Sequence, residues 1–216
     1  MGIFLRRGTA QRGMLASELE VGQTIKLSVN GKAWEWLVVN QGLPSSIYDA
    51  SCNGTWLLMK DIYEKRAWNS KDVNDYANST IYSYLNNTFL AMFDSNIQKA
   101  IKQVKIPYRK NGGSVQSGAN GLPCKIFLLS GYEVGWTTST NQYFPIDGAV
   151  LNYFKWTVST DSKRIAYLNG SAAFWWLRSP HSNITDYVWR VSTDGSSSIY
   201  NVSSLAGIRQ IGRAHV

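Results

Sequence analysis

Alternating apolar and polar positions near the start of the chain predict a β-hairpin followed by a core strand. The segments Gln23–Val29 and Ala33–Val39 flank Asn30-Gly31, a pair that tolerates the positive φ angles of a tight hairpin turn. Further along, the short apolar run Thr55–Lys60 has the length and composition of a buried strand. This part of the chain is therefore expected to be β-structure.

In the middle of the chain the apolar spacing changes to three and four residues, which predicts two helices. The first covers Ser79–Phe93. The second begins at Asp94 or Ser95 and ends near Val104. Gln98 follows Ser95 at the spacing of a capping box, which supports a helix start at this point.

Two later apolar runs, Cys124–Leu129 and Phe174–Pro180, predict core strands, and a second hairpin follows them. Its expected strands are Tyr187–Thr193 and Ser196–Val202, with Asp194-Gly195 as a two-residue turn. Ser, Asn and Tyr occupy this hairpin where a core strand would carry Val, Ile and Leu, a composition shared with adaptable binding loops. We therefore place the function in this hairpin.

The order of these elements predicts an α+β fold with antiparallel sheets and two helices. A chain of 216 residues buries a sizeable core without dividing into two domains. We expect a single domain over residues 20–209, preceded by an N-terminal arm over residues 1–19.

The composition describes a folded protein and argues against two classes of partner. With 13% aromatic and 17% charged residues, the chain does not have the profile of a disordered segment. The net charge of +8 is scattered except over Lys99–Lys110, where cations suit the end of the second helix, so no nucleic-acid partner is predicted. No apolar run approaches the roughly twenty residues of a membrane helix. Met1–Gly13 lacks the apolar core of a signal peptide, so neither membrane insertion nor a leader is predicted.

Side chains that commonly carry catalysis or bind metals are scarce. The only histidines are His181 and His215, and neither belongs to a recognised catalytic motif. Cys52 and Cys124 match no metal or redox spacing, so we expect two buried thiols, with a disulfide as the open alternative. The sequence predicts no catalytic residue, no metal site and no cofactor.

Several motifs together give the chain a family resemblance. They are the string Trp175–Pro180 (WWLRSP), the hairpin after it, the closing Gly207-Ile208-Arg209, the segment Lys125–Glu133 and the helix Ile81–Phe93. In these motifs the chain resembles, over nearly its whole length, a domain family common in gut bacteria and their phages. Many such domains are similar to the variable proteins of diversity-generating retroelements, in which an error-prone reverse transcriptase rewrites the end of the target gene.

The resemblance implies a C-type-lectin-like fold and a non-enzymatic binding protein with a changeable site. Its partner would be a protein or a glycan on a cell surface, and it would act at a virion tail tip or on a bacterial surface. The variable ligand-binding region would cover residues 181–206, with Tyr187, Arg190 and Tyr200 as anchors. The side chains expected on its exposed face are His181, Asn183, Ile184, Asp186, Tyr187, Arg190, Ser192, Ser196, Ser198, Tyr200, Asn201, Ser203 and Ser204.

Residue usage within 181–206 gives an independent check on this implication. Changes at the adenines of Asn codons yield many residue types but never Lys, Glu, Gln, Met or Trp. At the frequency of these five types in the rest of the chain, about five would be expected in a window of this length. The region holds one, Trp189, which favours diversification.

Two departures from the family pattern lead to further expectations. Gln210 stands where relatives usually continue with Pro, and the residues after it resemble a translated sequencing adapter, so residues 210–216 are expected to form a non-native tail outside the domain. The calcium-binding signature of lectins is also missing. Two alternatives stay open: a calcium-independent lectin of fixed sugar specificity, and an enzyme of the formylglycine-generating type, which would need a closely spaced reactive cysteine pair.

Overall fold

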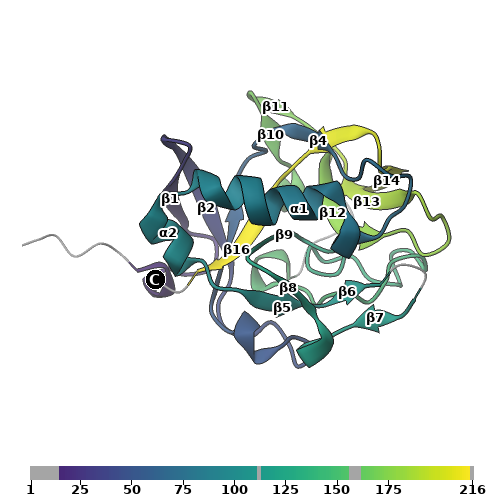
Figure 1. Ribbon diagram of the computed structural model, residues 1–216, viewed down its shortest axis with the longest axis horizontal. Helices are drawn as coiled ribbons and strands as arrows, with labels where there is room; N and C mark the ends of the chain where they lie inside the picture. Colours follow the sequence, from purple (N-terminus) through teal and green to yellow (C-terminus); the bar gives the residue numbers. More distant parts are fainter. Residues whose placement is uncertain (1–14, 111–112, 156–161, 215–216) are drawn as a thin grey trace, which may run out of the picture.

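The computed structural model describes residues 15–110, 113–155 and 162–214, and in these ranges two five-stranded sheets form the framework (Figure 1). The first sheet has the order β1 (Thr24–Val29), β2 (Lys32–Asn40), β3 (Thr55–Met59), β16 (Gln210–Ala214) and β9 (Ile126–Leu128). The second has the order β14 (Ser197–Asn201), β13 (Tyr187–Val191), β12 (Trp175–Pro180), β15 (Leu205–Gly207) and β4 (Lys65–Ala67). Shorter pairs join β5 (Val104–Ile106) to β8 (Leu122–Cys124), β6 (Tyr108–Arg109) to β7 (Val115–Gln116), and β10 (Tyr167–Leu168) to β11 (Ser171–Ala172).

The helical segments are short. α1 (Thr80–Tyr84) continues as a π-helical turn, Leu85–Phe89, and a 3-10 turn, Leu90–Met92, before α2 (Ser95–Ala100) begins. Single 3-10 turns lie at Ala16–Glu18, Ala50–Cys52, Tyr76–Asn78, Gly118–Asn120, Asn152–Phe154 and Ser162–Arg164. The fold is thus mixed and strand-rich, with several antiparallel sheets and few helices, which confirms the α+β class. Among the described residues, no helix has the length and apolar character needed to cross a membrane.

The first hairpin forms where the alternation predicted it. β1 and β2 pair antiparallel up to Val29 and Lys32, and the two turn residues have φ angles of 50° at Asn30 and 73° at Gly31. Such angles define the tight turn whose twist matches that of the strands. The strand expected at Thr55–Lys60 is confirmed as β3, and all five of its residues are buried.

The helical prediction is confirmed at its start and wrong at its end. Ser79 caps α1 by accepting a hydrogen bond from the backbone N–H of Tyr82, and the apolar side chains of the segment that follows face the core. The second helix stops at Ala100 instead of Val104. The chain is extended from Ile101 onward, because Lys102 donates its backbone N–H to Arg213 in β16 and Val104 pairs with β8.

The segment from Gln210 to Ala214 belongs to the first sheet, and the domain does not end at residue 209 as predicted. As β16 it lies between β3 and β9 and pairs antiparallel with both (Figure 1). Gln210 and Ile211 have no exposed surface. A central strand of this kind satisfies backbone groups on both of its sides, so removing it would leave two strand edges unpaired. His215 and Val216 lie outside the described residues.

The domain also begins earlier than predicted. Ala16 is fully buried, and the side-chain amide of Gln41 donates to the backbone oxygens of Ala16 and Leu19. Leu15–Leu19 is therefore part of the domain instead of the arm. The rest of the predicted arm, residues 1–14, lies outside the described residues.

The aromatic block of β12 is core on both of its faces. Trp175 and Trp176 have no exposed surface, and their indole N–H groups donate to the backbone oxygens of Arg164 and Arg66. This confirms the expectation that both are scaffold residues. Burying two such side chains contributes strongly to stability, because aromatic residues remove large areas from water.

A buried ion pair ties β12 to the loop that follows β9. Two guanidinium nitrogens of Arg178 lie 2.5 and 2.7 Å from the carboxylate oxygens of Glu133, and neither side chain is exposed. Arg178 also donates to the backbone oxygens of Leu128 and Asp147, while the Tyr48 hydroxyl donates to Glu133. Buried charges are tolerated only when they are satisfied in this way. The network fixes the position of β12, the strand that pairs with β13 of the second hairpin.

Candidate functional site

The second hairpin turns through three residues, not through the predicted two. The backbone N–H of Gly195 donates to the oxygen of Ser192, Ser192 donates to Ser196, and Gly195 has a φ of 81°. This is a type I turn followed by a left-handed residue, a common three-residue hairpin loop. Asp194 stabilises it by accepting hydrogen bonds from the N–H and the hydroxyl of Ser196.

The three-residue turn changes which side chains share a face. β13 and β14 pair so that Arg190 lies opposite Ser198 and Val188 lies opposite Tyr200. A two-residue turn would shift this register by one position and move every β14 side chain to the other face. Instead Tyr200 shares a face with Arg190. We call the side of the hairpin that carries Arg190, Ser198 and Tyr200 the outer face, and the opposite side the inner face.

The inner face anchors the hairpin in the core. Trp189 is 4% exposed, and its ring stacks on Phe144 with a centroid distance of 3.8 Å. Val191 is fully buried and Ile199 packs against the same core. Trp189 is therefore part of the scaffold that holds the hairpin.

His181 does not lie on an exposed face, and its predicted placement there was wrong. It is 5% exposed, and its ring packs between Tyr143 and Trp189. Its Nδ1 atom accepts hydrogen bonds from the backbone N–H groups of Asn183 and Ile184. Burial, helped by the charge of Arg109, lowers the pKa of His181, which keeps the ring neutral and able to accept. His181 thus holds the loop between β12 and β13 in shape.

On the outer face, Arg190 lies between two aromatic rings. Its guanidinium carbon is 4.0 Å from the ring centroids of both Phe174 and Tyr200, and its Nε donates to the Ser198 hydroxyl. Phe174 and Tyr200 are among the more exposed large apolar residues of the structure. Cation–π contacts of this kind hold a cation in place without neutralising its charge.

Sequence reasoning assigned Phe174 to the core strand and so missed its place on this face. Alternation alone gives no signal for this, because Trp176 lies on the same side of the strand as Phe174 and is fully buried. Asn74 was also missed. Its side-chain nitrogen lies 2.8 Å from the backbone oxygens of Ile184 and Tyr187, so it fixes the loop that enters β13.

The other predicted residues separate into two groups. By alternation, Ser192 and Ser196 continue the outer face toward the turn. The second group lies at the opposite end of the hairpin, where Asn201 donates to Asp186 and accepts from Ser203. Its members are Asn183, Ile184, Asp186, Tyr187, Asn201, Ser203 and Ser204, all exposed or half-buried. The structure therefore brings the predicted residues to one hairpin but not to one face.

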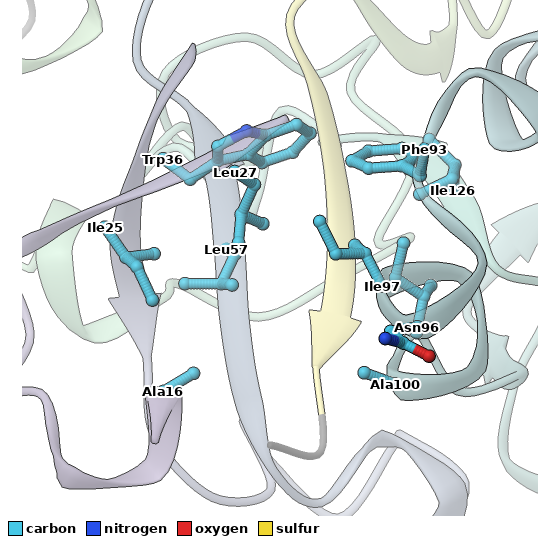
Figure 2. Close-up of a pocket in the computed structure, with 12 residues that line it drawn as sticks. Ala16, Ile25, Leu27, Trp36, Leu57, Phe93, Asn96, Ile97, Ala100 and Ile126 are labelled. Atoms are coloured by element: carbon cyan, nitrogen blue, oxygen red, sulfur yellow. The ribbon is translucent and has the colours of Figure 1, made fainter. Parts of the chain in front are cut away.

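An apolar pocket lies far from the hairpin, on the first sheet. Figure 2 shows side chains from β1, β2 and β3 facing those of α2 across it, and Figure 1 places β1 and α2 at the opposite side of the molecule from β13 and β14. Its volume is about 240 Å³. Its lining residues are Ala16, Ile25, Leu27, Trp36, Leu57, Phe93, Asn96, Ile97, Ala100, Ile101, Ile126 and Gly212. This pocket could not be predicted from the sequence, because its walls come from segments far apart in the chain.

Groups with reactive chemistry are buried away from these two surfaces. Cys52 and Cys124 are free thiols in the interior, as expected from the sequence. Burial raises the pKa of Cys52 to about 12 and that of Cys124 well above its ordinary value, so neither is a thiolate at neutral pH. Asp147 accepts hydrogen bonds from the Ser179 hydroxyl, and burial raises its pKa to about 7. Within the described ranges, no three His, Cys, Asp or Glu side chains gather as a metal site would require.

The fold and the site together define a strand-rich α+β domain that presents one hairpin on an aromatic core. The sequence matches the family described as "Domain of unknown function (DUF6273)" over residues 53–211, and the chain belongs to this family. The match begins just before β3 and includes the whole second sheet with its hairpin. No curated protein and no solved structure matches the chain.

Proposed function

We propose that this protein is a non-enzymatic ligand- or receptor-binding protein that displays a changeable surface on its second hairpin. In this proposal the domain has a C-type-lectin-like fold, and residues 181–206 are diversified as in the variable proteins of diversity-generating retroelements. The partner is a protein or a glycan on a cell surface, met at a virion tail tip or on a bacterial surface.

The observation that carries the proposal is the separation of anchoring and display on one hairpin. On the inner face Trp189 and Val191 are buried, whereas on the outer face Arg190 is half-buried and Tyr200 is exposed. Val188, opposite Tyr200, is the one buried strand residue of the outer face. Backbone hydrogen bonds join the two strands whatever their side chains are. Substitution at the accessible positions therefore leaves the framework of the hairpin intact, which is what a diversified surface requires.

Residue usage supports the same conclusion. Trp189 is the single residue in 181–206 that an altered Asn codon cannot encode, and it is also the inner-face anchor that stacks on Phe144. The exception to the codon pattern thus falls on a residue that the core needs. Diversification that spares such a position would change which ligand the protein binds and would leave the stability of the fold unchanged.

The exposed rings of Phe174 and Tyr200 favour a second candidate, a calcium-independent lectin of fixed specificity, because aromatic rings can stack on sugars. Such a lectin would keep the same residues in 181–206 among close relatives. An enzyme of the formylglycine-generating type needs reactive cysteines, whereas Cys52 and Cys124 are buried thiols. This favours either of the two binding functions.

The genomic neighbourhood tests the proposal. We expect a reverse-transcriptase gene and a near-copy of the segment that encodes residues 174–209, rich in AAC and AAU codons. Close relatives should differ mainly within 181–206 and at positions templated by adenine. Relatives that are identical in this region but differ elsewhere would refute diversification and favour the lectin.

A further inference from the structure

The outer edge of β14 has free backbone groups. β14 is the last strand of its sheet and pairs on one side with β13. Backbone hydrogen bonds flank this pairing, from Ser192 to Ser196 at one end and from Val202 to Asp186 at the other. Hydrogen-bonded pairs alternate along an antiparallel ladder, so Arg190 with Ser198 and Val188 with Tyr200 are also bonded pairs.

It follows that Ser197 and Ile199 point their backbone N–H and C=O groups away from β13. Among the described residues, neither N–H has a hydrogen-bond partner. Edge groups of this kind form a ready template for another extended chain. Both residues are half-buried, so the edge is accessible without being an extended apolar surface.

Next to this edge stands a cation without a counter-charge. Within the described part of the chain, ion pairs form at Glu35, Glu64 and Glu133, and none includes Arg190. The hydrogen bond from Arg190 Nε to the Ser198 hydroxyl brings the guanidinium next to β14, where it lies between the rings of Phe174 and Tyr200. The guanidinium of Arg190 is therefore fixed in place and has no anionic partner among the described residues. Such a group can form charge-assisted hydrogen bonds with a carboxylate.

The geometry joins these two features into one recognition surface. An antiparallel strand added to β14 would bond to Ser197 and Ile199, and the residue facing Ser198 would form a non-bonded pair with Cα atoms about 4.5 Å apart. Its side chain would rise on the outer face, where Ser198 is too small to block the path to Arg190. A Glu or Asp at that place would meet the guanidinium.

We propose that the outer edge of β14 binds an extended acidic segment of a protein partner, with backbone pairing at Ser197 and Ile199 and a carboxylate at Arg190. This inference rests on the proposed binding function and narrows its partner from protein or glycan to an acidic peptide strand. Strand addition of this kind takes affinity from main-chain hydrogen bonds and specificity from alternate side chains.

Selection from a displayed library of random ten-residue peptides on the full-length protein tests the proposal. Enriched sequences should combine β-branched residues with Asp or Glu. For a synthetic copy of the best peptide, replacing its acidic residue by the matching amide should weaken binding about tenfold or more, as expected for a charge-assisted hydrogen bond. Arg190→Met should have the same effect, and the two changes together should add little.

The proposed backbone pairing at Ser197 and Ile199 is tested with a separate variant. Ile199→Pro removes an N–H that the β13–β14 ladder does not use, a position where edge strands tolerate proline. It should abolish binding, whereas the matched control Ile199→Ala loses the same side-chain packing but keeps the N–H and should still bind. Should the Pro variant fail to fold, amide hydrogen exchange of the unmodified protein gives the answer, because Ser197 and Ile199 should be protected when the peptide binds.

Neutral or basic selected peptides, unchanged binding by Arg190→Met, or protection away from β14 would each overturn the proposal. Binding of glycans on an array with no enriched peptide would also overturn it, as would a concentration-dependent dimer that protects Ser197 and Ile199. None of these results affects the genomic test above. A failed peptide partner is therefore distinguishable from a failed display function.

Discussion

Two arginines on adjacent strands have opposite surroundings, and the difference separates the buried framework of this protein from the outer face of its second hairpin. Arg178 in β12 is fully buried, with Glu133 and several backbone oxygens around its guanidinium. Arg190 in β13 is half-buried, lies between two rings and meets no carboxylate among the described residues. The first charge is fully paired within the fold, whereas the second has no counter-charge among the described residues.

Replacing each arginine in turn is the strongest test of this difference between the two strands. Arg178→Met should destabilise the protein by about 3–5 kcal/mol or prevent folding, because Glu133 would be left buried without its partner. Arg190→Met should cost no more than about 1 kcal/mol, the scale of an exposed cation–π contact. Urea unfolding measures both, and equal costs would show that the two strands do not differ in the way described.

The two faces of the hairpin allow a second comparison with side chains of similar size. Trp189→Ala should cost on the order of 3–5 kcal/mol, because it empties a core position against Phe144. Tyr200→Ala, on the outer face, should cost about 1 kcal/mol or less. A soluble Trp189→Ala protein with unchanged thermal stability would contradict the assignment of the inner face.

The buried network should also respond to pH in a way that the hairpin turn does not. Burial raises the pKa of Asp147 to about 7, above its unfolded value of about 4. Between these values the native state holds more protons than the unfolded state, so the contribution of Asp147 to stability falls as pH rises. Asp147→Asn cannot ionise and should therefore gain stability relative to the parent from pH 5 to pH 8.

Urea midpoints at several pH values measure this effect. Asp194→Asn is the matched control, because hydrogen bonds from Ser196 lower the pKa of this exposed carboxyl and it stays ionised over the whole range. A difference between parent and Asp147→Asn that does not vary with pH would refute the account of the buried carboxyl.

The smallest expected effect concerns metals. Neither the buried framework nor the outer face contains the clustered carboxylates that calcium prefers, within the part of the chain that the structure describes. Calcium and a chelator should therefore leave the melting temperature unchanged. A clear rise with added calcium would reveal a site in the native state, because such a ligand stabilises only the form that binds it.

Local signals made the first hairpin predictable and the second one only in part. Asn30-Gly31 permits one short turn, whereas Gly195 fits both a two-residue turn and the left-handed position of a three-residue turn. The predicted exposed face nevertheless held Arg190, Ser198 and Tyr200 together, and the register set by the three-residue turn places them on one face. The contact of the Arg190 guanidinium with the rings of Phe174 and Tyr200 is visible only in the structure.

Long-range pairing explains the remaining differences. The sequence around β16 carries no sign that β3 and β9 lie on either side of it, so the segment was placed outside the fold. His181 was assigned to the display surface because it lies in a polar loop, while its ring partners, Tyr143 and Trp189, come from different parts of the chain. Patterns along a chain report local structure well but do not identify distant neighbours.

The central claim is that the outer face of the hairpin can change while the fold remains. The most direct measurement is thermal unfolding of a set of variants in which Arg190, Ser192, Ser196, Ser198 and Tyr200 are exchanged together for mixtures of Asn, Ser, Thr and Tyr. We predict melting temperatures within about 5 °C of the parent for most variants, since exposed substitutions each change stability by about half a kcal/mol or less. A parallel set exchanged at the inner-face residues Trp189 and Val191 should lose the folded state. If most outer-face variants also fail to fold, that face is structural and the display function is contradicted.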